Sequence, residues 1–242
     1  MNLLVLNPNT SVAMTENLLR QIGSIPAVHA RGSTASWGVE VIATYASFAI
    51  AAHAAIDTWA TLAAADVSGI DAILLGCFGD PGLAALQELA PVPVYGLASS
   101  AIEQTAREPG KFAVVTGGPG WRPILDQLVG SLGLADRYAG TFTARLNGLS
   151  MLADPVATAT LIDEQIACAM RAGAERIILG GAVFAGQCHR FTSKGPLVDC
   201  LEASLEWIAT QPVTSRAHDA LPAIRSHGLS DSLAGLLQQQ TR

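Results

Sequence analysis

The chain has 242 residues, half of them hydrophobic and only 14% charged, and its formal net charge is −6. This composition supports a sizeable buried core and excludes a disordered segment. The Lys and Arg residues are scattered, so the sequence predicts no nucleic-acid-binding surface.

The apolar stretches predict a cytoplasmic protein that does not enter a membrane. The N-terminal run at residues 3–6 lacks the basic segment and cleavage site of a signal peptide. The longest apolar stretch, residues 46–65, contains His53 and Asp57, which disfavour a membrane span. The high apolar content also predicts a homo-oligomer.

The cysteine pattern argues against a metal site and against disulfides. The four cysteines are Cys77, Cys168, Cys188 and Cys200. Their spacings match no zinc template and no CxxC pair, so we expect free thiols and no metal ligands.

Short apolar runs alternate with amphipathic segments along the chain. The predicted buried strands are residues 3–6, 72–75, 92–95, 111–115 and 177–179. The predicted helices are residues 12–22, 83–89, 156–172, 201–210 and 230–240, with another helix after Ser99 and Ser100. Fully apolar strands between helices indicate an α/β fold whose parallel sheets are covered on both faces.

An internal repeat divides this pattern into two halves. The sequence of residues 69–77 is similar to that of residues 173–181, and residues 93–96 align with residues 196–199. The repeat predicts two pseudo-symmetric α/β lobes with a cleft between them. We place the first lobe at residues 1–97, with the tail 211–242 packing back on it, and the second at residues 98–210.

Polar residues and glycines follow the ends of four predicted strands. Parallel sheets bind ligands beyond the carboxyl ends of their strands, so loops 7–11, 76–82, 116–121 and 180–186 should line one site. The candidate substrate-binding residues are Asn7, Asn9, Thr10, Ser11, Phe78, Gly79, Thr116, Gly117, Gly118, Gly181 and Ala182. One of the residues 9–11 is also expected to cap the helix that follows. The loops contain no Lys, and only Arg122 lies just beyond them, which favours a neutral ring or a monocarboxylate as ligand.

Cys77 lies where a strand gives way to a helix and is the candidate catalytic thiol. Backbone N–H groups and the helix dipole at such a position favour a thiolate and could hold an oxyanion or enolate. A buried cysteine without function is the alternative. The chain has no GxSxG, no HExxH and no GxGxxG after a strand, so serine hydrolases, zinc proteases and dinucleotide enzymes lack support.

Over residues 1–210 the chain resembles the hydantoin and allantoin racemase branch of the aspartate/glutamate racemase superfamily. Leu-Asn-Pro-Asn-Thr-Ser at 6–11 is similar to its N-terminal signature, and Gly-Cys-Phe-Gly-Asp-Pro-Gly at 76–82 to its first catalytic cysteine loop. Residues 93–96 and 113–116 are similar to its next strands. The resemblance implies a cofactor-independent isomerase that moves a proton next to a carbonyl of a hydantoin-like or amino-acid-derived small molecule.

The sequence departs from this family at the second catalytic thiol. In the family, a cysteine after a Leu-Gly pair faces the first one, whereas here the stretch is Leu179-Gly180-Gly181. The internal repeat independently places Gly181 against Cys77, and glycine cannot carry a proton. Three alternatives follow: Cys200, after another predicted strand, is the second proton carrier; the enzyme uses one thiol, as in the similar arylmalonate decarboxylases; or the chain is a non-catalytic binding protein.

Overall fold

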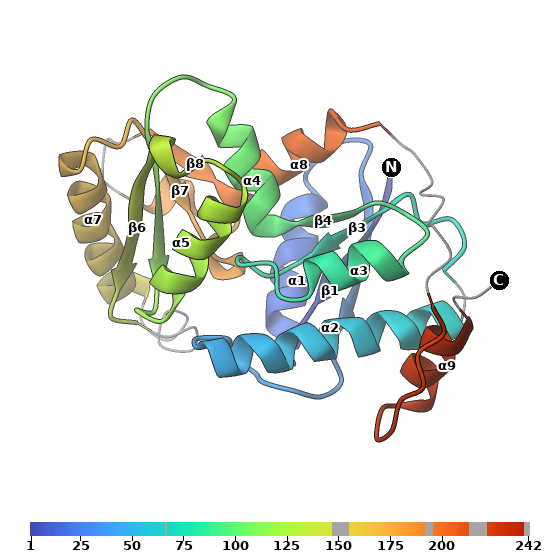
Figure 1. Cartoon of the computed structure of the whole chain (residues 1–242). Helices are drawn as coiled ribbons and strands as arrows, with labels where there is room; N and C mark the ends of the chain where they lie inside the picture. Colours follow the sequence, from blue (N-terminus) through green and yellow to red (C-terminus); the bar gives the residue numbers. More distant parts are fainter. Residues whose placement is uncertain (66, 147–154, 192–195, 213–221, 240–242) are drawn as a thin grey trace.

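The computed structural model describes residues 1–65, 67–146, 155–191, 196–212 and 222–239, which form two four-stranded parallel sheets (Figure 1). The first sheet has the order β2-β1-β3-β4 and the second β6-β5-β7-β8. The strands are β1 (Asn2–Asn7), β2 (His29–Thr34), β3 (Ala72–Leu75), β4 (Val94–Gly96), β5 (Phe112–Gly117), β6 (Tyr138–Ala144), β7 (Arg176–Leu179) and β8 (Leu197–Asp199). The matching orders confirm two pseudo-symmetric α/β lobes.

Helices connect the strands and cover both sheets. They are α1 (Val12–Ile22), α2 (Tyr45–Ala65), α3 (Leu83–Leu89), α4 (Leu97–Ala106), α5 (Trp121–Ser131), α7 (Pro155–Arg171), α8 (Cys200–Ala209) and α9 (Asp231–Gln239). In α1 the buried residues are Thr15, Leu18 and Ile22, a helical spacing that places one face against β1 and β2. The predicted strands and helices are therefore confirmed, with shifts of one or two residues at several ends.

The central strands are buried along their length because helices cover both faces of each sheet. All four residues of β3 and all six of β5 are buried. The apolar runs of the sequence follow from this burial, since a strand covered on both faces has no polar side.

The two lobes share a continuous core through α4 and α8, which pack against each other between the sheets (Figure 1). Ser204 on α8 donates to the carbonyl of Leu97 on α4 at 2.8 Å. The C-terminal helix α9 packs against α2 in the first half. The exact limits of the two lobes stay a prediction.

Two strands, two helices and one helix start differ from what the sequence predicts, and the two helices that were not predicted are α2 and α5. β2 and β6 were not predicted, because they are edge strands with half-exposed, largely polar sequences rather than apolar runs. Ser99 and Ser100 lie inside α4, which begins at Leu97, and not before it.

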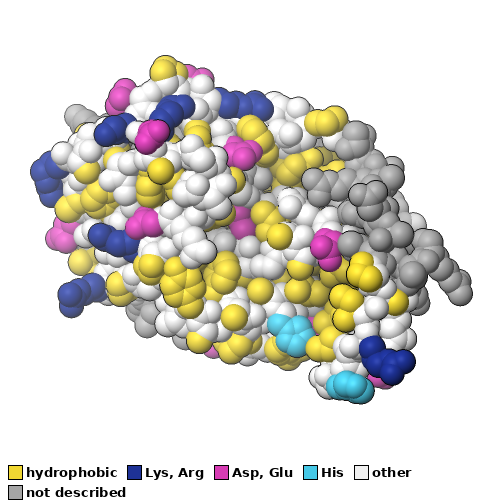
Figure 2. Space-filling model, viewed as in Figure 1, with side chains coloured by type: hydrophobic (Ala, Val, Ile, Leu, Met, Phe, Trp, Pro, Cys, Tyr) yellow, Lys and Arg dark blue, Asp and Glu magenta, His cyan; other side chains and the backbone are white. Residues whose placement is uncertain are grey.

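Helix α2 has the length and hydropathy of a membrane span, and a third of its most apolar window is buried against the rest of the protein. It contacts β1, α3 and α9, and hydrophobic side chains gather over it on the face in Figure 2. The buried Asp57 on α2 accepts a hydrogen bond from Trp37 Nε1 at 2.8 Å and another from Ser230 Oγ. This carboxylate joins α2 to the segment after β2 and to the start of α9.

Asp57→Ala should lower the free energy of unfolding by about 1–2 kcal/mol, because two donors lose their acceptor. Urea denaturation measures the change. Glu88→Ala, which removes an exposed carboxylate from α3, is the control and should be near neutral. Equal stability of the two variants would show that Asp57 does not hold these segments together.

Candidate active site

A cavity of about 110 Å³ lies between the lobes, at the carboxyl ends of β1, β3, β5 and β7. Of the residues expected from the sequence, it is lined by Asn9, Ser11, Cys77, Phe78, Thr116, Gly117, Gly118, Gly181 and Ala182. Further lining residues are Met14, Glu40, Val41, Ile42, Ala43, Gly76, Trp121, Leu146 and Val183. All four predicted loops thus reach one cavity.

Asn7, Thr10 and Gly79 do not line the cavity but support its walls. Asn7 is fully buried, and its Nδ2 lies 3.0 Å from Asn9 Oδ1 and from the carbonyl of Ser11. The N–H of Thr10 donates to the carbonyl of Val39, which ties the first loop to the segment after β2. Ser11 occupies the N-cap position of α1, although its side chain makes no capping hydrogen bond.

Gly79 is a position where a side chain does not fit. A Cβ built there would lie 2.4 Å from the ring of Trp121, and its φ of 147° is unfavourable for other residues. Glycine therefore lets Trp121 of the second lobe close over the loop of the first.

Cys200 is not placed to act on a ligand in this cavity, contrary to its candidate role. It is fully buried at the start of α8, and its Sγ lies 3.7 Å from the carbonyl oxygen of Gly181. The thiol therefore lies behind the backbone that forms the wall. Strand-end position alone suggested otherwise, because it does not reveal which way a side chain points.

The surroundings of Cys77 favour the protonated thiol rather than the thiolate expected from its strand-end position. Its side chain is 6% exposed; burial, and then the nearby Asp80 carboxylate, raise its pKa far above the usual range. Its N–H donates to the carbonyl of Leu75, and α3 begins only at Leu83, so the N-terminus of the following helix does not adjoin the sulfur. A protonated thiol is suited to donate a proton.

Asp80 connects the Cys77 loop to the core between the lobes. Its carboxylate accepts hydrogen bonds from the N–H groups of Ala98 and Ser99, at 2.9 and 2.7 Å, at the start of α4. Burial raises the pKa of Asp80 to about 6, although these N–H groups lower it. A Cβ on Gly96 would lie 2.2 Å from this carboxyl group, so glycine leaves the room for it.

Gly181 differs from Cys77 in backbone conformation as well as in side chain. Its φ and ψ are 127° and 134°, a region that L-residues rarely adopt. There is room for a side chain at position 181, since a Cβ there would lie 3.4 Å or more from its neighbours, with Thr116 Oγ1 at 3.7 Å. A cysteine at this position would therefore require the loop to change its backbone.

Glu40 is the residue of chemical interest that sequence reasoning missed. Among the described lining residues, Glu40 and Cys77 carry the ionisable side chains. Glu40 lies in the segment after β2. Because the sequence of β2 is polar, it does not predict a strand there, and no strand-end loop is expected at Glu40. Within the described ranges, no group of three His, Cys, Asp or Glu side chains could hold a metal ion.

Asp80→Asn should lower the pKa of Cys77, because a neutral amide removes the adjacent negative charge. The pKa of Asp80 is about 6, so its carboxylate is charged throughout the alkaline range in which thiols titrate. The measurement is iodoacetamide labelling against pH, followed on the Cys77 peptide by mass spectrometry. Asp136→Asn, at an exposed site, should leave the profile unchanged; a profile equally unchanged in Asp80→Asn would remove Asp80 as a cause.

Gly181→Ala should lower the free energy of unfolding by about 1–2 kcal/mol, because alanine is strained at a φ of 127°. Gly130→Ala is the matched control: it lies inside α5, with open space around its Cβ, and should be neutral or stabilising. Wild-type stability of Gly181→Ala would mean that the loop readily adopts an ordinary backbone.

Comparison with known proteins places the chain in a family. The Asp/Glu/Hydantoin racemase family model matches residues 3–208. The chain is 28% identical to the hydantoin racemase of Rhizobium meliloti, over 94% of this chain and 98% of that protein. It is 31% identical to the hydantoin racemase of Paenarthrobacter aurescens, over 84% and 88%.

Solved structures agree with the sequence comparison. The structure of allantoin racemase from Klebsiella pneumoniae superposes with a TM-score of 0.83 at 25% identity and covers 98% of both chains. Sequence, strand order and superposition lead to the same assignment. The chain belongs to the Asp/Glu/hydantoin racemase family, in its hydantoin and allantoin racemase branch, and is an isomerase of the racemase class.

Proposed function

We propose that this racemase transfers a proton at the carbon next to a carbonyl of a hydantoin-like or amino-acid-derived small molecule, with Cys77 as a proton-carrying thiol and no cofactor. The observation that carries the proposal is the position of Cys77 in the cavity between the lobes, among loops from both. General acid–base catalysis requires a titratable group within reach of the reacting carbon.

The polar groups around Cys77 suit a carbonyl ligand. Asn9 Oδ1 is held by Asn7 Nδ2 at 3.0 Å and by the N–H of Ser11 at 2.9 Å, which orients the amide and leaves Nδ2 as its donor group. Asn9 and the Thr116 hydroxyl both line the cavity. Such donors stabilise the oxygen of an enolate, whose charge develops when the α-proton leaves.

Glu40 is our candidate for the second proton carrier. It lines the cavity, whereas Cys200 is buried behind the wall and Gly181 has no side chain. A carboxylate can remove a proton that the Cys77 thiol returns on another face. Glu40→Gln should therefore abolish inversion, because the protonated Cys77 thiol cannot itself remove the α-proton.

A single-thiol reaction is the second candidate, and the glycine-specific backbone of Gly181 favours it. Loss of CO₂ from a malonate-type acid leaves a carbanion that needs only one proton, and a protonated Cys77 can donate it. The alternative of a binding protein without catalysis predicts ligand binding but no proton exchange.

The test is α-proton exchange in D₂O, followed by NMR, over hydantoins, allantoin, aspartate, glutamate and arylmalonates, with enzyme-free controls. Exchange with inversion supports racemisation with two carriers. Exchange without inversion, or release of CO₂, supports the single-thiol reaction. Binding without exchange of any compound contradicts the enzymatic proposal.

Cys77→Ala should lower turnover by about 10²–10⁴-fold, the typical effect of removing a catalytic acid or base. Cys200→Ala is the matched control, because it removes a buried thiol that does not reach the cavity. Circular dichroism verifies that both variants fold. Full activity of Cys77→Ala would refute the assignment, and loss of activity in a folded Cys200→Ala would restore Cys200 as a candidate.

The location and assembly of the protein stay predictions. We propose a cytoplasmic homo-oligomer that binds a small molecule and neither nucleic acid nor membrane. Exposed apolar side chains on α2, among them Tyr45 (52% exposed) and Ile50 (42% exposed), support the oligomer.

A further inference from the structure

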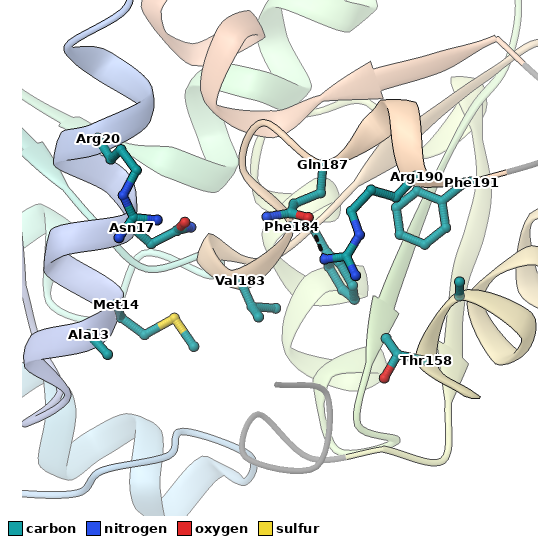
Figure 3. Close-up of a pocket in the computed structure, with 11 residues that line it drawn as sticks. Ala13, Met14, Asn17, Arg20, Thr158, Val183, Phe184, Gln187, Arg190 and Phe191 are labelled. Atoms are coloured by element: carbon teal, nitrogen blue, oxygen red, sulfur yellow. Dashed lines mark hydrogen bonds between the residues drawn. The ribbon is translucent and has the colours of Figure 1, made fainter. Parts of the chain in front are cut away.

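A second cavity, of about 250 Å³, adjoins the Cys77 cavity. It lies between α1 and the segment after β7, which contains the short 3-10 helices η2 (Ala182–Phe184) and η3 (Cys188–Arg190) (Figure 3). Met14 and Val183 line both cavities. The two spaces are therefore adjacent, and these two side chains border both of them.

Two arginines from different lobes line this second cavity. Arg20 lies on α1, one helical turn beyond Asn17, and Arg190 lies on η3 across the cavity (Figure 3). Arg190 Nη1 donates to Gln187 Oε1 at 2.7 Å. Among the described residues, neither guanidinium has a carboxylate partner, although the chain has more acidic than basic residues.

The remaining polar groups fix the walls of this cavity. Asn17 Nδ2 donates to the carbonyl of Ala182 at 3.0 Å, which fixes η2 against α1. The hydrogen bond from Arg190 holds Gln187 at the cavity wall. Two guanidiniums that present several N–H donors are suited to bind a carboxylate, which accepts hydrogen bonds in the same plane.

The Cys77 cavity has the opposite character. Its described lining includes Glu40 and no Lys or Arg, so it offers no cationic partner to an anionic group. Its volume of about 110 Å³ leaves little room beyond a small ring. An anionic substituent on that ring would be stabilised in the second cavity, which Arg20 and Arg190 line.

We propose that the second cavity binds the carboxylate of a substrate whose reacting ring lies in the Cys77 cavity. The preferred substrate class is then a hydantoin-type ring with a substituent that ends in a carboxylate. This inference rests on the proposed function of the Cys77 cavity and adds the substrate class. It also assigns a binding role to Arg20 and Arg190.

The experiment compares 5-(2-carboxyethyl)hydantoin with its neutral amide, 5-(2-carbamoylethyl)hydantoin, which has nearly the same size. The wild type should show a higher kcat/KM of C5 proton exchange for the carboxylate. Arg20→Gln and Arg190→Gln should each lower kcat/KM for the carboxylate about fivefold and leave the amide unchanged. Arg31→Gln removes an exposed arginine of β2 outside both cavities and should preserve the preference.

Equal rates for the two compounds in the wild type, or a preference that survives when Arg20→Gln and Arg190→Gln are combined in one protein, would overturn the proposal. Isothermal titration of both compounds, on the wild type and all these variants, separates this result from failure of the proposed function. If no compound exchanges but both arginine variants weaken binding of the carboxylate alone, the anion cavity stands and the reaction fails. Free glutarate is the last probe: if it binds without competing with the carboxyethyl compound, the cavity serves a separate anion and the substrate assignment is overturned.

Discussion

Burial of both faces of each sheet is the constraint on which the rest of the structure depends. The central strands β3 and β5 are buried along their whole length, so polar chemistry is confined to the strand ends. The two sheets have the same strand order and meet through α4 and α8. Loops from the ends of β1, β3, β5 and β7 therefore reach one cavity, and the segments after β2 and β6 complete its lining.

The two halves share a topology but not a chemistry. Asp80 accepts hydrogen bonds at the start of α4, and Asp199 accepts them at the start of α8. The residues at the ends of β3 and β7 differ, because Cys77 carries a thiol and Gly181 has a backbone that L-residues avoid. Proton transfer by sulfur is thus available on one side of the cavity, which makes the second carrier the central chemical question.

Charge is divided between the two neighbouring cavities. Glu40 lines the Cys77 cavity, and Arg20 and Arg190 line the second cavity. A neutral reacting ring and an anionic substituent match this division. Val183, two residues after Gly181, lines both cavities. The loop that contains Gly181 therefore borders both the site of the reaction and the site that binds the substituent.

The sequence by itself determined the buried strands, most of the helices, the two-lobed repeat and the position of Cys77 at a strand end, because apolar periodicity and strand-end position are local properties. It did not reveal the edge strands β2 and β6, whose half-exposed faces break the apolar pattern. Only the tertiary structure decided that the pKa of Cys77 is raised and that Cys200 lies outside the cavity, because burial and side-chain direction depend on packing. The same holds for Glu40 at the Cys77 cavity and for Arg20 and Arg190 at the second cavity, because both cavities form only when the lobes pack against each other.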